Sequence, residues 1–165
     1  MADEIAVQIE DRLGAVIKAA ATGAADRVYA DDEFRIDKAK TYVRIACSSS
    51  RLVENRFPGR HVVEVTDYSI TATIFTTAAA AGGSPRRFVR NEAAKVRKAI
   101  AANRTLKDEH GVALVYRTRW QSQASAVDGT GENARAACQM NFIARTANAD
   151  DDPTKSLPQL AAEQD

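Results

Sequence analysis

The chain has 165 residues, of which 45% are hydrophobic and 27% charged, the size and composition of one soluble globular domain. Aromatic residues make up only 6%, and much of the apolar content is alanine, which predicts a thin core. No run approaches the roughly 18 uninterrupted apolar residues of a membrane span. Asp3, Glu4 and Glu10 interrupt the apolar segment that a signal peptide needs. We therefore expect a protein that is made in the cytosol and has no membrane partner.

The net charge of +1 conceals two regions of opposite charge. Residues 86–119 carry ten Lys or Arg against three acids. The last eighteen residues carry five acids against Lys155 alone. This segregation favours head-to-tail contacts between copies of the chain, or contact with a polyanion.

Apolar residues at helical spacing predict an amphipathic helix over residues 3–21, followed by an acidic loop over residues 24–40. From Thr41, apolar and polar residues alternate, which predicts a half-buried strand that ends near Cys47. Residues 48–60 begin with three serines and contain a Phe-Pro-Gly turn, so we expect a mobile loop there.

Residues 60–77 show the strongest strand pattern of the chain. The alternation changes phase near Thr66 and Asp67, so we expect one long strand with a β-bulge. The alanines and glycines of residues 78–83 predict a flexible joint. The Ser-Pro pair that follows predicts a helix over residues 85–103, because serine caps a helix and proline is tolerated at its first position.

Two further strands are predicted near the end of the chain, over residues 114–120 and 136–144. An Asp-Gly-Thr-Gly turn at residues 128–131 joins them. The whole connection, residues 121–134, is long for a hairpin and is expected to be mobile. Residues 149–165 are predicted to form a disordered polar tail.

These elements predict an α/β (α+β) fold, with a mainly antiparallel sheet and two helices packed on one of its faces. Residues 1–148 are expected to form a single domain. The apolar positions of the predicted strands define the expected core: Val43, Ile45, Ile70, Ile74, Leu114, Met140 and Phe142.

The sequence contains no recognisable catalytic, cofactor or metal site. His61 and His110 have no Cys, Asp or Glu at ligand spacing. The glycines of residues 129–131 precede a strand and lack the Lys-Ser/Thr pair of a phosphate loop. Cys47 and Cys138 lie in alternating apolar runs and are predicted to be free core thiols, with a disulfide between neighbouring strands as the alternative. We expect no enzymatic activity and no cofactor.

The predicted helix at 85–103 is rich in arginine. On a helical wheel, Lys95 and Lys98 lie on the far side from a narrow arginine stripe beside the apolar face. The interpretations are a solvated helix with intersubunit salt bridges, a stripe that pairs with acidic loops of a neighbouring copy, or a nucleic-acid interface. Phe88 is the only aromatic residue of this helix, so little aromatic surface is offered for base stacking. The candidates for intersubunit or DNA-channel contact are Arg86, Arg87, Arg90, Arg97 and Arg104.

The order of the predicted elements resembles that of a family of phage proteins. A lone N-terminal helix and an acidic loop precede a strand that ends near Cys47 and a long strand from Val62 to Thr77. A helix that opens at Ser84 and a two-strand unit that ends with residues 140–145 follow. Over residues 3–146, this order is similar to that of the tail terminator (tail completion) proteins of long-tailed bacteriophages, which cap the tail tube of lambda-like phages.

The resemblance implies a small α/β fold that assembles as a hexameric ring at the head-proximal end of the tail. Such a ring sits on the last ring of tube protein, stops tube polymerisation and joins the neck or connector proteins of the head. The implied partners are other copies of the chain, the tail tube protein, the neck proteins, and DNA that passes through the lumen without sequence readout. No catalytic residue or cofactor is implied, and no individual functional residue is carried over, because the family has no short motif.

Two other functions remain open from the sequence. The chain could be another ring-forming head–tail connector (neck) protein. It could also be a non-specific nucleic-acid-binding module that uses the basic helix at residues 85–104.

Overall fold

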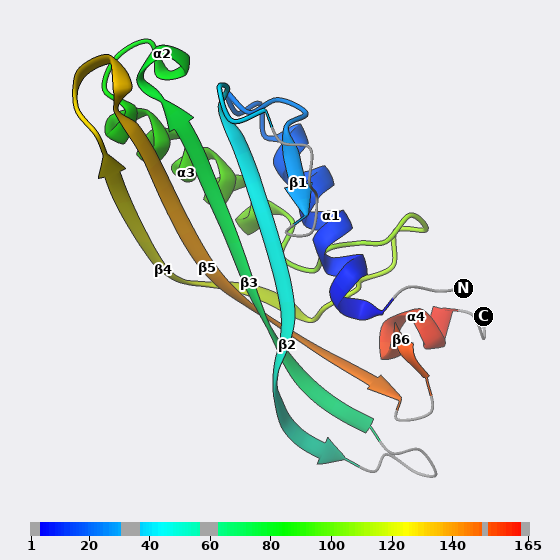
Figure 1. Ribbon diagram of the computed structural model, residues 1–165. Helices are drawn as coiled ribbons and strands as arrows, with labels where there is room; N and C mark the ends of the chain where they lie inside the picture. Colours follow the sequence, from blue (N-terminus) through cyan, green and yellow to red (C-terminus); the bar gives the residue numbers. More distant parts are fainter. Residues whose placement is uncertain (1–3, 31–36, 57–62, 150–151, 163–165) are drawn as a thin grey trace.

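A computed structural model describes residues 4–30, 37–56, 63–149 and 152–162 of the chain. It confirms the predicted fold class: one mixed but mostly antiparallel sheet of six strands, with helices against one face (Figure 1). The order of the strands across the sheet is β1-β2-β3-β5-β4, and β6 pairs with β5. Their bounds are Val28–Ala30 (β1), Tyr42–Arg56 (β2), Val63–Thr77 (β3), Arg117–Asp128 (β4), Arg135–Ala149 (β5) and Asp152–Ser156 (β6).

Two long helices cover one face of the sheet, as the sequence predicts (Figure 1). They are α1 (Ile5–Ala19) and α3 (Pro85–Ala102). The apolar stripe of each helix is buried against the strands, because these residues recur at every third or fourth position. All seven predicted core residues are at most 2% exposed.

The alternation of β3 and β5 sets which side chains face the helices. Ile70 and Ile74 of β3 lie opposite Phe142 and Cys138 of β5 in the antiparallel register, and all four are buried. Side chains of the other parity lie on a face that no described helix covers.

Several predicted loops are strands in the structure. β2 continues through residues 48–56, so the prediction of a loop there is wrong, while residues 57–60 lie outside the described part of the chain. Likewise β4 runs on to Asp128, so residues 121–128 are strand rather than a mobile connection. The turn that follows contains a short 3-10 helix, η1 (Gly131–Asn133). The sequence does not reveal the strand at residues 121–128, because β4 is an edge strand with mostly exposed side chains, and such side chains need no apolar alternation.

Three smaller corrections concern β3, the joint after it and residue Leu114. β3 pairs with β5 without interruption, and the register shifts that accompany the phase change lie in β2, at Ser49/Arg51 and Leu52/Glu54. Residues 78–81 form a short helix, α2 (Ala78–Ala81), because the Thr77 hydroxyl accepts a hydrogen bond from the Ala80 N–H. Leu114 is buried but precedes β4 rather than lying in it.

The tail also differs from the prediction of disorder beyond residue 149. The pairing of β4 with β5 reaches only to Arg145, which lies opposite Arg117, and β6 pairs with the last residues of β5 beyond that point. It is followed by α4 (Leu157–Ala162). Ser156 is fully buried, and its hydroxyl donates to the Ala113 carbonyl. Polar side chains hold this segment in place, which explains why an apolar pattern does not reveal it.

Candidate functional site

Helix α3 presents its basic side chains beside the edge of the sheet. It begins at a Ser84 cap, whose hydroxyl accepts a hydrogen bond from the Arg87 N–H at 3.4 Å. Its buried face includes Val96 and Ile100, which pack on the strands. This packing fixes the rotation of the helix and therefore places Arg97 at the margin between α3 and β4.

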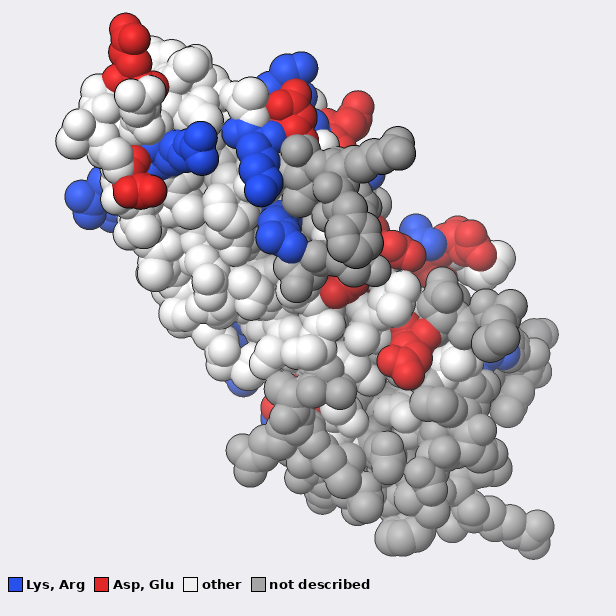
Figure 2. Space-filling view, viewed as in Figure 1, with Lys and Arg blue, Asp and Glu red and all other residues white. Residues whose placement is uncertain are grey.

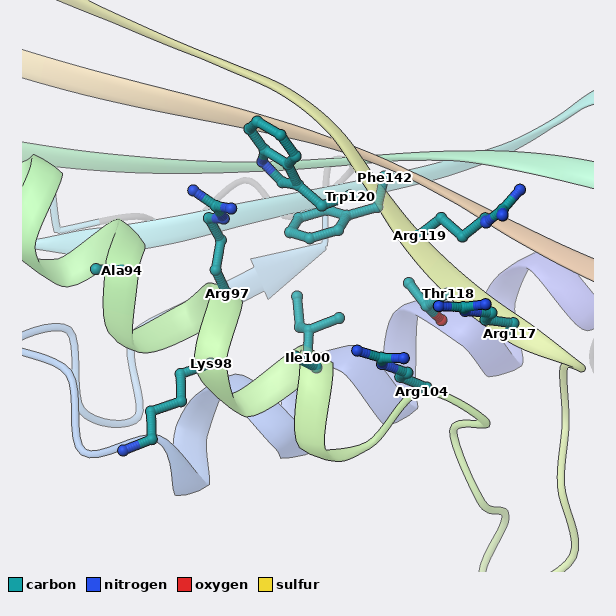
Figure 3. A pocket seen from close by; sticks show the side chains of 11 residues that line it. Ala94, Arg97, Lys98, Ile100, Arg104, Arg117, Thr118, Arg119, Trp120 and Phe142 are labelled. Carbon is teal, nitrogen blue, oxygen red and sulfur yellow. The ribbon is translucent and has the colours of Figure 1, made fainter.

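A groove of about 540 Å³ lies between α3 and the edge strand β4 (Figure 3). Its floor includes apolar side chains of the core, Ile100 and Phe142. Five exposed cationic residues line it, and no acidic residue does. We call it the cationic groove, and its charged lining residues are Arg97, Lys98, Arg104, Arg117 and Arg119.

Among the residues that the structure describes, none of the five cations of the cationic groove forms an ion pair with a carboxylate. Basic residues elsewhere do have such partners. Lys95, on the same helix, lies 2.8 Å from the Glu92 carboxylate. Arg145 forms a two-pronged contact with Asp67 at 2.8 and 3.0 Å. The positive charge of the cationic groove is therefore available to be neutralised by a partner or by solvent ions.

Trp120 is the single aromatic residue that rises from β4 into the cationic groove. It is the only tryptophan of the chain and is 46% exposed, unusual for so large an apolar side chain. The Arg97 Cζ lies 4.0 Å from its ring centroid (Figure 3). This cation–π contact restrains the guanidinium, since the face of an indole attracts a cation.

A buried hydroxyl completes the lining of the groove. Thr118 is 5% exposed, and its backbone N–H donates to the Arg104 carbonyl at 2.7 Å, which ties the end of α3 to β4. Its Oγ1 has no hydrogen-bond partner within the described residues. An unpartnered buried hydroxyl costs free energy, so such a group calls for a partner that the isolated chain does not supply.

The structure divides the predicted arginines into two groups. Arg97 and Arg104 line the cationic groove, whereas Arg86, Arg87 and Arg90 are exposed on the first turns of α3, outside it. Lys98, expected on the far side of the helix, also lines the groove.

The contribution of β4 was missed by sequence reasoning. Arg117, Arg119 and Trp120 belong to a predicted strand and were not connected with the helix. The signal that could have revealed them is the basic run around the only tryptophan of the chain. Its pairing with α3 depends on the sheet order.

The cysteines are free, as predicted, and are poor nucleophiles. Burial, and then the nearby Glu10 carboxylate, raise the pKa of Cys47 to about 12. Burial also raises the pKa of Cys138, although Arg90 and a hydrogen bond from Gln123 act in the opposite direction. Across the described ranges, no group of three or more His, Cys, Asp or Glu could hold a metal ion. His61 lies outside those ranges.

The uncovered face of the sheet is a second distinctive surface. Figure 2 looks onto this face and shows few charged side chains along its middle. A polar network crosses three strands there: Asn141 of β5 donates to the Ser122 hydroxyl of β4 at 2.9 Å and accepts from the Thr71 hydroxyl of β3 at 3.4 Å. No helix within the described residues is long and apolar enough to cross a membrane.

The fold and the groove therefore define a small α+β protein with a concentrated cationic surface. No protein-family profile matches the chain. No curated protein matches it either.

Solved structures are similar to it, among them the following two. One is a chain of the structure described as "Virion of native gene transfer agent (GTA) particle", with a TM-score of 0.42 and 18% identity over 89% of this chain and 96% of that one. The other carries no descriptive name and has a TM-score of 0.39 and 14% identity over 84% of this chain and 91% of that one. At these scores and identities, neither likeness defines the family or the function.

Proposed function

We propose that this protein is a virion structural component that closes the head-proximal end of a phage tail as a ring of copies, six in the family it resembles. The observation that carries the proposal is the order and layering of the elements. An antiparallel sheet with α1 and α3 on one face is the fold that the resemblance implies. In this role the protein stops tube polymerisation and joins the tail to the neck.

The surface is consistent with assembly. The middle of the sheet face that the described helices leave uncovered carries few charged side chains, so it is suited to contact with another protein, because little charge must be desolvated there. In a ring each copy offers two different surfaces to its neighbours. The exposed Arg86, Arg87 and Arg90 lie outside the cationic groove and are our candidates for contact with an acidic surface of the next copy. We propose no catalytic role and no cofactor.

The proposal is tested by electron microscopy of phage particles made without this protein. We expect overlong tails, or tails that are not attached to heads. The mass of the purified native protein should show a ring or a concentration-dependent oligomer. Normal infectious particles in its absence would overturn the proposal.

A neck protein that forms a ring by the same contacts is the second candidate. Particles that lack it should have tails of normal length that stay separate from the heads. Tail length therefore separates the two functions.

A further inference from the structure

We propose that the cationic groove binds the phosphodiester backbone of a nucleic acid, without reading base sequence. Four arginines and one lysine border the groove between α3 and β4, with the only tryptophan of the chain at its wall. In Figure 3 the side chains of Lys98 and Arg119 extend outward from its rims. This inference goes beyond the structural role proposed above and does not depend on the formation of a ring.

The charge of the groove is the first argument. Like charges held close together repel, and here no carboxylate of the described residues offsets them. Lys95, a basic residue of α3 outside the groove, is paired with Glu92. The chain thus neutralises a lysine outside the groove and leaves the five cations inside it available for an external anion.

The kind of cation is the second argument. Guanidinium groups bind the oxygens of phosphates through two parallel hydrogen bonds, and Arg predominates over Lys in this groove. The Arg97 guanidinium is held over the Trp120 ring at 4.0 Å, so less conformational freedom is lost when it binds a phosphate. Thr118 also lines the groove, and its buried hydroxyl has no hydrogen-bond partner among the described residues.

The exposed indole distinguishes a nucleic acid from an acidic peptide. Proteins that bind single strands without sequence preference combine a basic groove with an aromatic side chain on which a base stacks. Trp120 supplies an exposed aromatic surface from β4, whereas Phe88, the one aromatic residue of α3, packs against the core. An acidic segment of another copy would be attracted by the same charges but would gain little from the indole.

Trp120 also provides the measurement, because it is the only tryptophan of the chain and its fluorescence can be excited separately from that of the tyrosines. Titration of the full chain with oligothymidylate should change this fluorescence. The logarithm of the association constant should fall linearly with the logarithm of salt concentration, by about 0.7 for each phosphate contacted. A duplex of random sequence should show a comparable dependence if its backbone alone is bound.

Matched variants test whether the groove is the site. Arg104→Gln and Arg119→Gln should each lower the salt slope by about 0.7 for a single strand, measured by anisotropy of labelled DNA. Arg135→Gln removes the same charge from an exposed residue of β5 outside the groove and should leave the slope unchanged. Trp120→Leu should weaken single-strand binding by about 5- to 150-fold, the range for one stacked base. Circular dichroism confirms that each variant is folded.

Three outcomes would overturn the proposal. Equal losses for Arg135→Gln and Arg104→Gln would mean that binding follows net charge rather than the groove. An unchanged affinity for Trp120→Leu would remove the stacking argument. No DNA binding, together with salt-sensitive self-association that Arg104→Gln weakens, would show that the groove holds an acidic segment of a second copy.

Discussion

The guanidinium of Arg97 lies over the indole of Trp120, with its Cζ 4.0 Å from the ring centroid. The first residue belongs to α3 and the second to the edge strand β4, so their contact fastens the helix to the margin of the sheet. A cation–π pair at an exposed site contributes about 0.5–1 kcal/mol. The same contact that organises the cationic groove therefore adds to the stability of the fold.

Arg97→Gln should lower the free energy of unfolding by about 0.5–1 kcal/mol, because the cation–π contact is lost. Urea unfolding followed by circular dichroism measures this change. Arg90→Gln is the matched control, since it removes the same charge from the same helix outside the groove. Equal destabilisation by the two variants would show that the contact with Trp120 has no stabilising effect of its own.

The C-terminal segment is fastened by Gln159. Its side-chain nitrogen donates to Asp108 at 3.2 Å and to Gln8 of α1 at 3.3 Å, and its oxygen accepts from the Ser156 N–H at 2.9 Å. Burial alone would raise the pKa of Asp108, but hydrogen bonds from the Val112 N–H, Gln159 and the His110 N–H bring it below its usual value. The stability from Asp108 is thus present at neutral pH and lost as the pH falls through its lowered pKa.

Gln159→Ala should move the pKa of Asp108 upward and lower the free energy of unfolding at neutral pH by about 1 kcal/mol. An NMR titration of the Asp108 carboxyl measures the first effect, and urea unfolding the second. Gln139→Ala is the control, because Gln139 is an exposed side chain of β5. An unchanged pKa of Asp108 in Gln159→Ala would show that the C-terminal segment is not docked in solution.

The sequence predicts those helices and strands in which buried apolar residues recur at a regular spacing. Ile9 and Val96 recur with helical neighbours, and Ile70 alternates with polar residues, so α1, α3 and β3 were all located correctly. β4 beyond Trp120 and the β6–α4 segment were missed. Their side chains are exposed or joined by polar contacts, and such contacts leave no apolar pattern in the chain.

The helix side of the cationic groove could be predicted from the sequence, because the spacing of the apolar residues of α3 shows how the helix is rotated. For this reason Arg97 of α3 and Arg104 just after it stand out, and both were predicted candidates. Arg117 and Arg119 join them only because β4 lies at the sheet edge beside α3. Strand order depends on long-range pairing, which the sequence of a single strand does not specify.

Cys47 gives the protein a pH dependence in alkaline solution. Its pKa is raised from about 9 to about 12, so between these values the unfolded chain loses a proton that the folded chain keeps. The free energy of unfolding should therefore fall as pH rises above 9, by up to about 1.4 kcal/mol per pH unit from this group. In Cys47→Ala this part of the slope should disappear. An unchanged slope between pH 9 and 10.5 would contradict the assignment.

The loop after α1 is attached to α3 by a buried carboxylate. Glu92 is 4% exposed, and its two oxygens accept hydrogen bonds from the Gly23 N–H at 2.7 Å and from Lys95 at 2.8 Å. Gly23 cannot be replaced without a shift, because a Cβ there would lie 2.7 Å from the Phe88 ring. The loop is thus held against α3 by the hydrogen bond from Gly23 to Glu92 and by the packing of Gly23 against the Phe88 ring.

Glu92→Ala should lower the free energy of unfolding by about 1.5–3 kcal/mol, the range for a hydrogen bond to a charged group. Lys95→Ala should cost less than about 1 kcal/mol, because the lysine side chain is 51% exposed and its ion pair is screened by solvent. Glu92→Gln keeps an acceptor for the Gly23 N–H, so its loss in free energy of unfolding should lie between those of the other two variants. Urea unfolding of the three variants measures the order, and a loss in Lys95→Ala as large as that in Glu92→Ala would assign the stabilisation to the ion pair instead.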